Sequence, residues 1–304
     1  MKKVFLIFFT FLVTFFKLVL PYKVCNILAL GGGGSFGAVE VGILKDIIEK
    51  KILKPKFDVI TGISAGALNG AYLAQGNNII KNIDELEQIY KNIKTKDIYF
   101  RQYNKVLSNW CLFNNSPLEN TIRKIIINKK FTNSSPLTLI GATNINTQKL
   151  DIFKFNNLNE DLQVDILMAT SAIPILFKPR RINNDLYVDG GTIENEILYQ
   201  VINEYKADYY NFTYISSTNK QDKYTEINNL LDYTITISSL LVNNYIYDIA
   251  KIKDSYFDCK RGKINIFYPT SERLNNYNIL DFDSGEDLIK IAKESYNFET
   301  INFC

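Results

Sequence analysis

Apolar residues in this chain form short unbroken runs that alternate with segments of helical spacing. Residues 25–30 (CNILAL) are one such run, and the stretch 57–70 (FDVITGISAGALNG) opens with another. Between them, residues 38–51 place apolar side chains three or four positions apart, which is the period of an amphipathic helix. Strand, helix and strand in this order are typical of α/β proteins, whose parallel strands are buried on both faces.

The alternation continues through the rest of the chain. Ser116 and Ser284 are the expected N-caps of two later helices, whereas residues 226–251 are rich in β-branched side chains and only partly helical in pattern. We predict an α/β fold, a three-layer α/β/α sandwich with a largely parallel central sheet, in one domain over residues 23–304. Further strands are expected at 137–143, 149–155, 186–189, 207–216 and 263–268, and further helices at 83–93, 117–127, 161–170 and after Ser284.

The first 22 residues have a different pattern. Lys2 and Lys3 precede an uncharged, mostly apolar run over residues 4–16, and the segment ends near Pro21. This arrangement predicts a secretory signal or a membrane anchor, although no small-x-small cleavage site follows and the run is shorter than the roughly 20 residues of a full span. A buried or surface-lying helix is the alternative. We therefore expect a membrane-associated or secretory protein, and the cytoplasmic face of a membrane is also compatible with the pattern.

Composition narrows the chemistry. The 304 residues are 46% apolar and carry a formal net charge of +3, so there is no basic footprint for a nucleic-acid partner. The chain contains no histidine, which excludes a Ser-His-Asp triad and any histidine-ligated metal. The four cysteines show no C-x-x-C spacing, and we expect buried free thiols, no metal and no cofactor. They are Cys25, Cys111, Cys259 and Cys304.

The sequence Gly62-Ile63-Ser64-Ala65-Gly66 lies where the second strand passes into a helix. A serine on such a reversal projects its side chain freely, and the flanking glycines remove Cβ atoms that would clash. The start of the following helix also directs unpaired N–H groups and the positive end of its dipole toward the group that the serine attacks. Ser64 is therefore the candidate nucleophile, although G-x-S-x-G alone is equally consistent with an ordinary tight turn.

A glycine loop follows the first strand over residues 31–37 (GGGGSFG). Its backbone N–H groups suit a phosphate or a developing oxyanion, and Gly32, Gly33 and Gly34 are the candidate oxyanion donors. The spacing of Gly32, Gly34 and Gly37 also matches a dinucleotide fingerprint. That alternative requires an acidic residue at the end of the second strand, where this chain has the serine turn.

Asp189-Gly190-Gly191 ends another apolar run. A carboxylate beside two glycines can approach a second backbone closely, so Asp189 is the candidate partner of Ser64. Taken alone, Asp-Gly-Gly is more often a plain turn. With no histidine in the chain, a carboxylate or a lysine must activate the serine.

Together, LGGGGSFG, FDVITGISAGALNGA and the later D-G-G closely resemble the patatin-like phospholipases. The resemblance implies a patatin-like catalytic domain over residues 23–304 and lipid acyl hydrolysis of the phospholipase A type. It also implies a Ser64–Asp189 dyad, with Gly37, Gly62, Gly66, Gly190 and Gly191 supporting the motifs. The expected partners are a membrane phospholipid or another acyl lipid and the membrane surface; no protein partner is indicated.

Two positions depart from the family pattern. Phe36 stands where a basic residue is usual in the glycine loop, and Ile197 replaces a proline after the retained Asn195. The loss of the basic residue favours the alternative of a catalytically weak or inactive lipid-binding protein.

Three further segments keep two interpretations each. Residues 94–110, rich in aromatic and basic side chains, are a lipid-contacting lid or a packed insertion. Arg180 and Arg181 contact anionic head groups or are simply solvated. The family-like string ATSAIPILFKP at residues 169–179 is expected to carry the chain back toward the active site.

Overall fold

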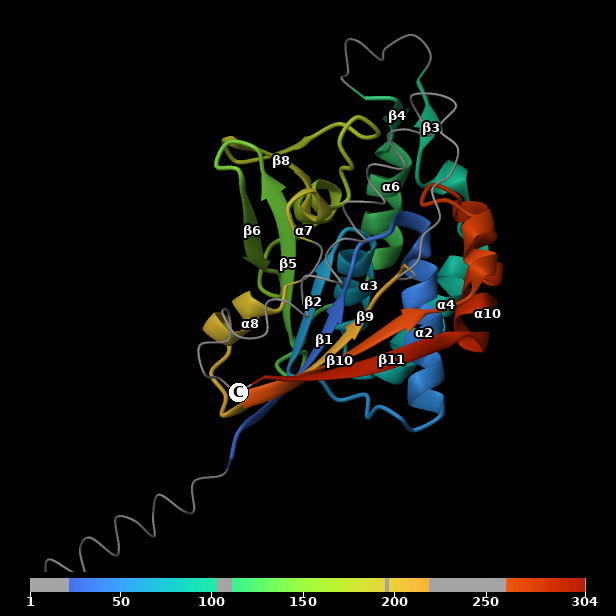
Figure 1. Ribbon diagram of the computed structural model, residues 1–304. Helices are drawn as coiled ribbons and strands as arrows, with labels where there is room; N and C mark the ends of the chain where they lie inside the picture. Colours follow the sequence, from blue (N-terminus) through green and yellow to red (C-terminus); the bar gives the residue numbers. More distant parts are fainter. Residues whose placement is uncertain (1–21, 103–110, 195–196, 219–260, 304) are drawn as a thin grey trace, which may run out of the picture.

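The computed structural model describes residues 22–102, 111–194, 197–218 and 261–303. A twisted sheet of nine strands forms the centre of this part of the chain, and helices pack against it (Figure 1). The strands of the sheet are β1 (Val24–Leu30), β2 (Val59–Ile63), β5 (Leu137–Asn144), β6 (Lys149–Lys154), β7 (Arg180–Ile182), β8 (Asp185–Asp189), β9 (Tyr209–Ile215), β10 (Arg261–Pro269) and β11 (Tyr296–Phe303). The helices are α2 (Gly37–Glu49), α3 (Ala65–Leu73), α4 (Ile79–Asn92), α6 (Ser116–Thr121), α7 (Glu160–Thr170), α8 (Tyr199–Glu204) and α10 (Gly285–Glu294).

The strand order is β11-β10-β9-β1-β2-β5-β8-β7, with β6 paired to β5. The central strands β10, β9, β1, β2 and β5 all run parallel, and antiparallel pairs occur only toward the margins. This confirms the predicted α/β class and the largely parallel central sheet. The carboxyl ends of β1 and β2 therefore meet at the same edge, at the centre of the sheet.

The central strands are apolar throughout because both of their faces are covered. In β1, Leu28 and Leu30 belong to one buried cluster, whereas Ile27 and Ala29 belong to another. Alternate side chains of a strand point to opposite faces of a sheet. Burial of both sets explains why the run at 25–30 shows no polar alternation and why it predicts a strand in a layered fold.

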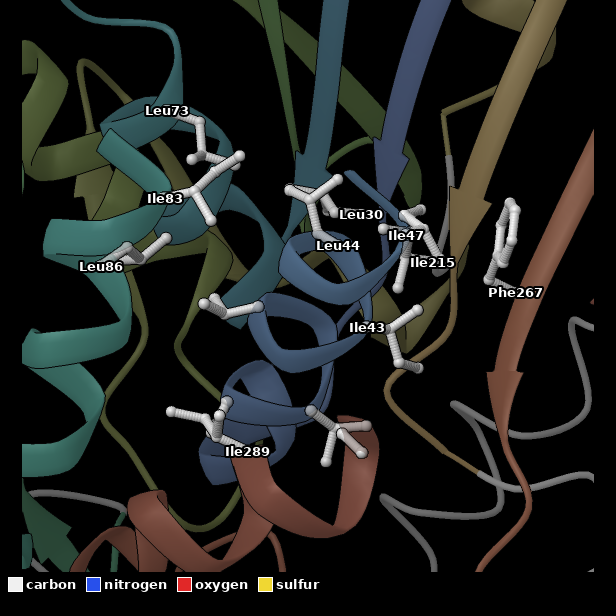
Figure 2. Close-up of a cluster of buried hydrophobic side chains, with 14 of the residues drawn as sticks. Leu30, Ile43, Leu44, Ile47, Leu73, Ile83, Leu86, Ile215, Phe267 and Ile289 are labelled. Carbon is white, nitrogen blue, oxygen red and sulfur yellow. The ribbon is translucent and has the colours of Figure 1, made fainter. Parts of the chain in front are cut away.

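The first face of the sheet carries most of the described helices. Figure 2 shows α2 between the sheet and two other helices: Ile43 and Ile47 lie toward Ile215 and Phe267 of the strands. On its other sides α2 packs against α4 and α10, where Ile289 lies. Helix α2 is therefore apolar around most of its circumference.

Farther along the same face, α3, α6 and α7 enclose a cluster that includes buried residues of β5.

The second face is covered, in the described part of the chain, by α8. Its residues Val201 and Ile202 pack against Tyr210 and Phe212 of β9. Residues 219–260 follow β9 in the chain, and the predicted helical stretch at 226–251 falls within this range, outside the described residues. The three layers of the predicted sandwich are thus a helical layer, the sheet and the layer to which α8 belongs.

Some local predictions need correction. Ser116 is not an N-cap but the first residue of α6, which continues as a π-helix over Ile122–Ile126. Helix α4 begins four residues earlier than predicted because the Asn78 side chain accepts a hydrogen bond from the Lys81 N–H. Ser284 does stand at the N-cap of α10, but its side chain makes no capping hydrogen bond; its hydroxyl donates to Asp281 instead.

The hydrophobic segment predicted at residues 1–22 lies almost wholly outside the described residues, so its role as signal or anchor stays a prediction. Within the described ranges, no helix combines the length and the apolar character needed to cross a bilayer. Cys25 and Cys111 are buried free thiols, as predicted. Cys259, Cys304 and Asn195 fall outside the described residues.

Arg180 at the start of β7 joins three elements. Its guanidinium donates to Asp165 of α7 at 2.8 Å and to Glu119 of α6 at 3.0 Å. These two carboxylates raise the pKa of Arg180 despite its partial burial, which acts in the opposite direction. Arg181 is exposed, and its hydrogen bond goes to the carbonyl of Asn184 in the adjoining turn. Arg180 is therefore a structural ion-pair residue, neither free for a head group nor simply solvated.

This arrangement predicts that Arg180→Ala lowers the free energy of unfolding by about 1 to 2 kcal/mol, because two partly buried carboxylates lose their partner. Arg181→Ala is the matched control and should change it by less than about 0.5 kcal/mol. Urea denaturation measures both. Unchanged stability of Arg180→Ala together with weaker lipid binding would instead assign Arg180 to head-group recognition.

Candidate active site

Ser64 stands between the end of β2 and the start of α3, with φ 52° and ψ −124°. This region of backbone space is sparsely populated by residues other than glycine and persists only where surrounding contacts enforce it. The Ser64 N–H donates to the Thr170 hydroxyl at 2.9 Å, and that hydroxyl donates to the Gly141 carbonyl at 2.6 Å. Thr170 is fully buried at the end of α7, so it fixes the strained turn to the neighbouring strand β5.

Asp189 ends β8 beside this turn. The Ser64 Oγ donates to Asp189 Oδ2 at 2.7 Å, and the Gly191 N–H donates to Oδ1 at 2.9 Å. The Asp189 N–H donates to the Ala172 carbonyl, which ties β8 to the family-like string predicted to approach the site. The two candidate residues, 125 positions apart in sequence, are therefore direct hydrogen-bond partners.

The glycine loop lies beside the same serine. Gly32, Gly33 and Gly34 line a cleft of about 380 Å³ together with Ser64 and Asp189. The loop is held from behind: the Ser217 hydroxyl donates to the Gly32 carbonyl at 2.5 Å. From the other side, the Ser35 N–H donates to Ile279 and the Ser35 hydroxyl to Asn278.

The orientation of the loop leaves donors available. Gly34 has φ +57°, in the left-handed region that favours glycine, and a Cβ there would meet the Ile279 carbonyl at 2.1 Å. Among hydrogen bonds between described residues, none uses the N–H of Gly33 or Gly34. Both glycines line the cleft that Ser64 and Asp189 also line.

Comparison with known proteins places these features in a family. The family model for patatin-like phospholipases matches residues 28–202, more than half of the chain. The chain belongs to the patatin-like phospholipase family. Membership confirms the resemblance found in the sequence motifs and supports a lipid-hydrolysing enzyme.

Two viral proteins are similar in sequence to this patatin-like chain. Uncharacterized protein R571 of Acanthamoeba polyphaga mimivirus is 29% identical over 76% of this chain and 80% of its own length. Probable lipid hydrolase 463L of Invertebrate iridescent virus 6 is 26% identical over 57% of this chain and 62% of its own length. Among solved structures, VipD from Legionella pneumophila aligns with a TM-score of 0.38 and 12% identity, covering 91% of this chain and 68% of that one.

Four of the five glycines predicted to support the motifs occupy positions of close approach. A Cβ at Gly66 would lie 2.1 Å from the Gly31 carbonyl, and one at Gly62 would lie 2.4 Å from the Gly66 carbonyl. Gly37 approaches Tyr90 and Gly190 approaches Gly141 in the same way. These glycines let the serine turn, the glycine loop and β8 converge in this patatin-like site.

An apolar cavity adjoins the cleft that contains Ser64 and Asp189 and shares Gly34 and Ser64 with it. Its wall is mainly aliphatic and aromatic. Contributing side chains include Leu68 of α3, Leu86 and Ile89 of α4, Leu118 of α6, and Phe177 and Leu280 from loops. This lining suits a hydrocarbon chain rather than a polar substrate.

A buried polar network that the sequence did not reveal lies behind the glycine loop. Glu40 of α2 is 1% exposed and accepts a hydrogen bond from the Asn69 side chain at 2.8 Å. Asn69 also donates to the Gly37 carbonyl and accepts from the Tyr90 hydroxyl. Burial raises the pKa of Glu40 well above its usual range, opposed by hydrogen bonds from Asn69 and the Gly31 N–H. The network links the loop, α3 and α4; the only sequence signal was a charge between Val39 and Val41.

The two departures from the family pattern are accommodated by packing. Phe36 ends the short 3₁₀ turn Gly34–Phe36 and packs at the border of two apolar clusters. Ile197 is fully buried beside Gly141, the residue whose carbonyl accepts from Thr170. Neither side chain lines the catalytic cleft or the apolar cavity. Within the described ranges, no group of three His, Cys, Asp or Glu side chains is arranged to hold a metal ion.

Burial changes the acidity of Asp189. Burial raises its pKa from 3.8 to about 7, and the hydrogen bonds from Ser64 and Gly191 oppose this shift only in part. A carboxylate with an ordinary pKa is a weak base, whereas one titrating near neutrality is matched to proton transfer. The raised pKa also means that ionised Asp189 destabilises the fold, since the folded state holds its proton more tightly than the unfolded chain.

We predict that ester hydrolysis rises with pH through an apparent pKa of about 7, because Asp189 must be ionised to act as a base. Asp189→Asn should abolish hydrolysis yet stabilise the protein relative to the wild type, increasingly so as pH rises from about 5 to about 8. Activity profiles and thermal denaturation at both pH values measure the two effects. A pH-independent rate across this range would contradict the assignment of the base.

Proposed function

We propose that the protein is a lipid acyl hydrolase of the phospholipase A type that works through a Ser64–Asp189 dyad. The observation that carries the proposal is the 2.7 Å hydrogen bond from a serine on a strained strand-to-helix turn to a buried carboxylate. The Asp189 carboxylate also caps the turn at Gly190–Thr192 through Gly191, and its second oxygen is left to the Ser64 hydroxyl beside the glycine loop. This arrangement matches the roles of nucleophile, base and oxyanion site in acyl transfer.

In the proposed reaction, Asp189 takes the Ser64 hydroxyl proton while Oγ attacks the carbonyl carbon of an acyl ester. The carbonyl oxygen becomes an oxyanion, stabilised by N–H groups of the glycine loop, with Gly33 and Gly34 as donors beside Gly32. The N–H of Ala65, at the positive end of the α3 dipole, adds a further donor. Collapse expels the alcohol, which receives the proton from Asp189. Water then attacks the acyl-enzyme by the same route and releases the fatty acid.

The apolar cavity defines the substrate class that we propose. Its shared boundary with the catalytic cleft at Gly34 and Ser64 places a hydrocarbon pocket next to the reacting carbonyl. A fatty acyl chain buried there loses contact with water, and its burial favours binding by about 0.8 kcal/mol per methylene group. The remainder of the lipid extends from the cleft, whose lining includes the loop glycines, Pro174 and Thr192. Membrane phospholipid or another acyl lipid meets these requirements.

The proposed substrate also suggests where the protein works. Membrane lipids are presented at a bilayer, so we propose that the protein works at a membrane surface as a catalytic domain over residues 23–304. The hydrophobic run at residues 1–22 would serve as signal or anchor and place the protein on a membrane or in the secretory pathway.

A lipid-binding protein with little or no turnover is the second candidate. It is favoured by Phe36, which places an aromatic side chain where the family commonly carries a positive charge near the oxyanion loop. Phe36 packs into apolar clusters away from the cleft, which favours an unperturbed loop geometry over a disabled one. Covalent labelling separates the two candidates, because a fluorophosphonate reacts with an activated serine but not with a binding site.

We predict that the purified protein is labelled by a fluorophosphonate and releases fatty acid from phospholipid vesicles. Ser64→Ala should abolish labelling and lower hydrolysis by at least about 10³-fold, because both require the nucleophile. Ser135→Ala is the matched control: its hydroxyl accepts from the Thr132 N–H in a surface turn, and Ser135 lines neither the cleft nor the apolar cavity. Full hydrolysis by Ser64→Ala would refute the dyad, and an unlabelled, inactive wild type would establish the binding protein.

The acyl pocket yields a separate prediction. Leu118→Trp inserts bulk into the cavity wall from α6, where Leu118 is 4% exposed. It should lower hydrolysis of long-chain esters at least about tenfold more than that of short-chain esters, because only long chains need the filled volume. Leu118→Met conserves volume and should leave the chain-length profile unchanged. Equal losses for all chain lengths in Leu118→Trp would place the acyl chain elsewhere.

A further inference from the structure

Ile175 combines a strained backbone with an exposed apolar side chain. Its backbone has φ +70°, a left-handed conformation that is a clear outlier for a β-branched residue. Its side chain is also 53% exposed. Glycine would adopt this backbone without strain, so an isoleucine here costs about 1 to 3 kcal/mol and still presents its side chain to the outside.

Hydrogen bonds enforce this conformation. The Leu112 N–H donates to the Ile175 carbonyl and the Phe113 N–H to the Leu176 carbonyl, each at 2.9 Å. Phe113 belongs to β4 (Phe113–Asn114), which pairs with β3 (Phe100–Arg101) in a small antiparallel sheet. Three short segments therefore lie side by side, and Phe100 on the first of them is 49% exposed. We call Phe100, Arg101, Ile175 and Lys178 the rim.

The rim adjoins the catalytic cleft. Pro174, directly before Ile175, lines the cleft that contains Ser64 and Asp189. Ile173 and Phe177, two positions before and after Ile175, line the apolar cavity. In Figure 1 the strands β3 and β4 stand at the end of the molecule toward which β1 and β2 run. The exposed apolar tips are thus on the same edge as the nucleophile.

The rim carries two basic residues. Arg101 follows Phe100, Lys178 lies three residues after Ile175, and both residues are exposed. Apolar tips with adjacent cations fit the boundary between acyl chains and anionic head groups.

We propose that the rim inserts Phe100 and Ile175 into an anionic lipid surface and so opens the catalytic cleft directly onto the bilayer. This inference rests on the proposed lipid hydrolase function. The strain at Ile175 is then the cost of presenting a rigid apolar side chain beside the cleft. A lipid molecule reaches Ser64 from the rim without its acyl chain crossing bulk water.

The first experiment needs no turnover. The sequence contains a single tryptophan, Trp110, so Trp110→Phe gives a background in which Phe100→Trp is the sole indole. In the full chain carrying Ser64→Ala, bromolipids in anionic vesicles should quench this indole by at least about half. Phe298→Trp in the same background is the matched control, because Phe298 is 56% exposed on the edge strand β11. Equal quenching at both positions, or none at position 100, would overturn the proposal.

The second experiment measures function at the rim. Phe100→Ser combined with Ile175→Gly should lower the ratio of vesicle hydrolysis to soluble-ester hydrolysis at least about tenfold, and Phe298→Ser should not change it. A merely structural role would reduce both activities together and leave the ratio unchanged, which would contradict the proposal. If the wild type is inactive on both substrates, the hydrolase proposal fails while the quenching result still decides the docking surface.

Discussion

The active site depends on how closely the chain after β2 approaches the chain after β1. Parallel pairing of these strands brings their carboxyl ends to one edge, but pairing alone leaves the two following segments a side chain apart. The missing Cβ of Gly66 closes that gap, since any side chain there would overlap the carbonyls of Leu30 and Gly31. Ser64, the proposed nucleophile, and the glycine loop, the proposed oxyanion site, are therefore neighbours through backbone contact, not through long side chains.

A second constraint is the burial of charge. Asp189 is 6% exposed and accepts hydrogen bonds from two donors, Ser64 and Gly191. These two bonds favour the ionised carboxylate but only partly offset the effect of burial, which raises its pKa. A third donor would lower its pKa and weaken it as a base, whereas removal of one would leave it protonated at neutral pH. Thr170 contributes on the serine side: it satisfies the Ser64 N–H, so the strained turn does not also leave a buried donor unpaired. The hydrogen bonds of Asp189 and Ser64 thus affect both the stability of the fold and the proposed reactivity of the pair.

The sequence predicted the parts of this site that depend on local backbone chemistry. Glycine at positions of close approach, a serine between strand and helix, and the absence of histidine lead to Ser64 and Asp189 as partners. Thr170 and the Glu40–Asn69–Tyr90 network were missed because their significance comes from contacts across the fold. The edge strand β11 was not predicted. It mixes polar and apolar residues, and its partner β10 is separated from it in sequence by α10, so the strand is evident only from the pairing in the fold. Neither interpretation of Arg180, head-group contact or solvation, included its ion pairs, because its two carboxylate partners lie 15 and 61 residues away in sequence.

The direction of β1 determines where the first residues of the chain join the described fold. The strand begins at Val24 and spans seven residues, or about 23 Å at about 3.3 Å per residue, before it delivers the chain to the glycine loop. The described chain therefore enters the fold at one end of β1, whereas Ser64 and the rim lie at the other. Whatever the role of residues 1–22, they join the described fold at the end of the molecule away from the cleft.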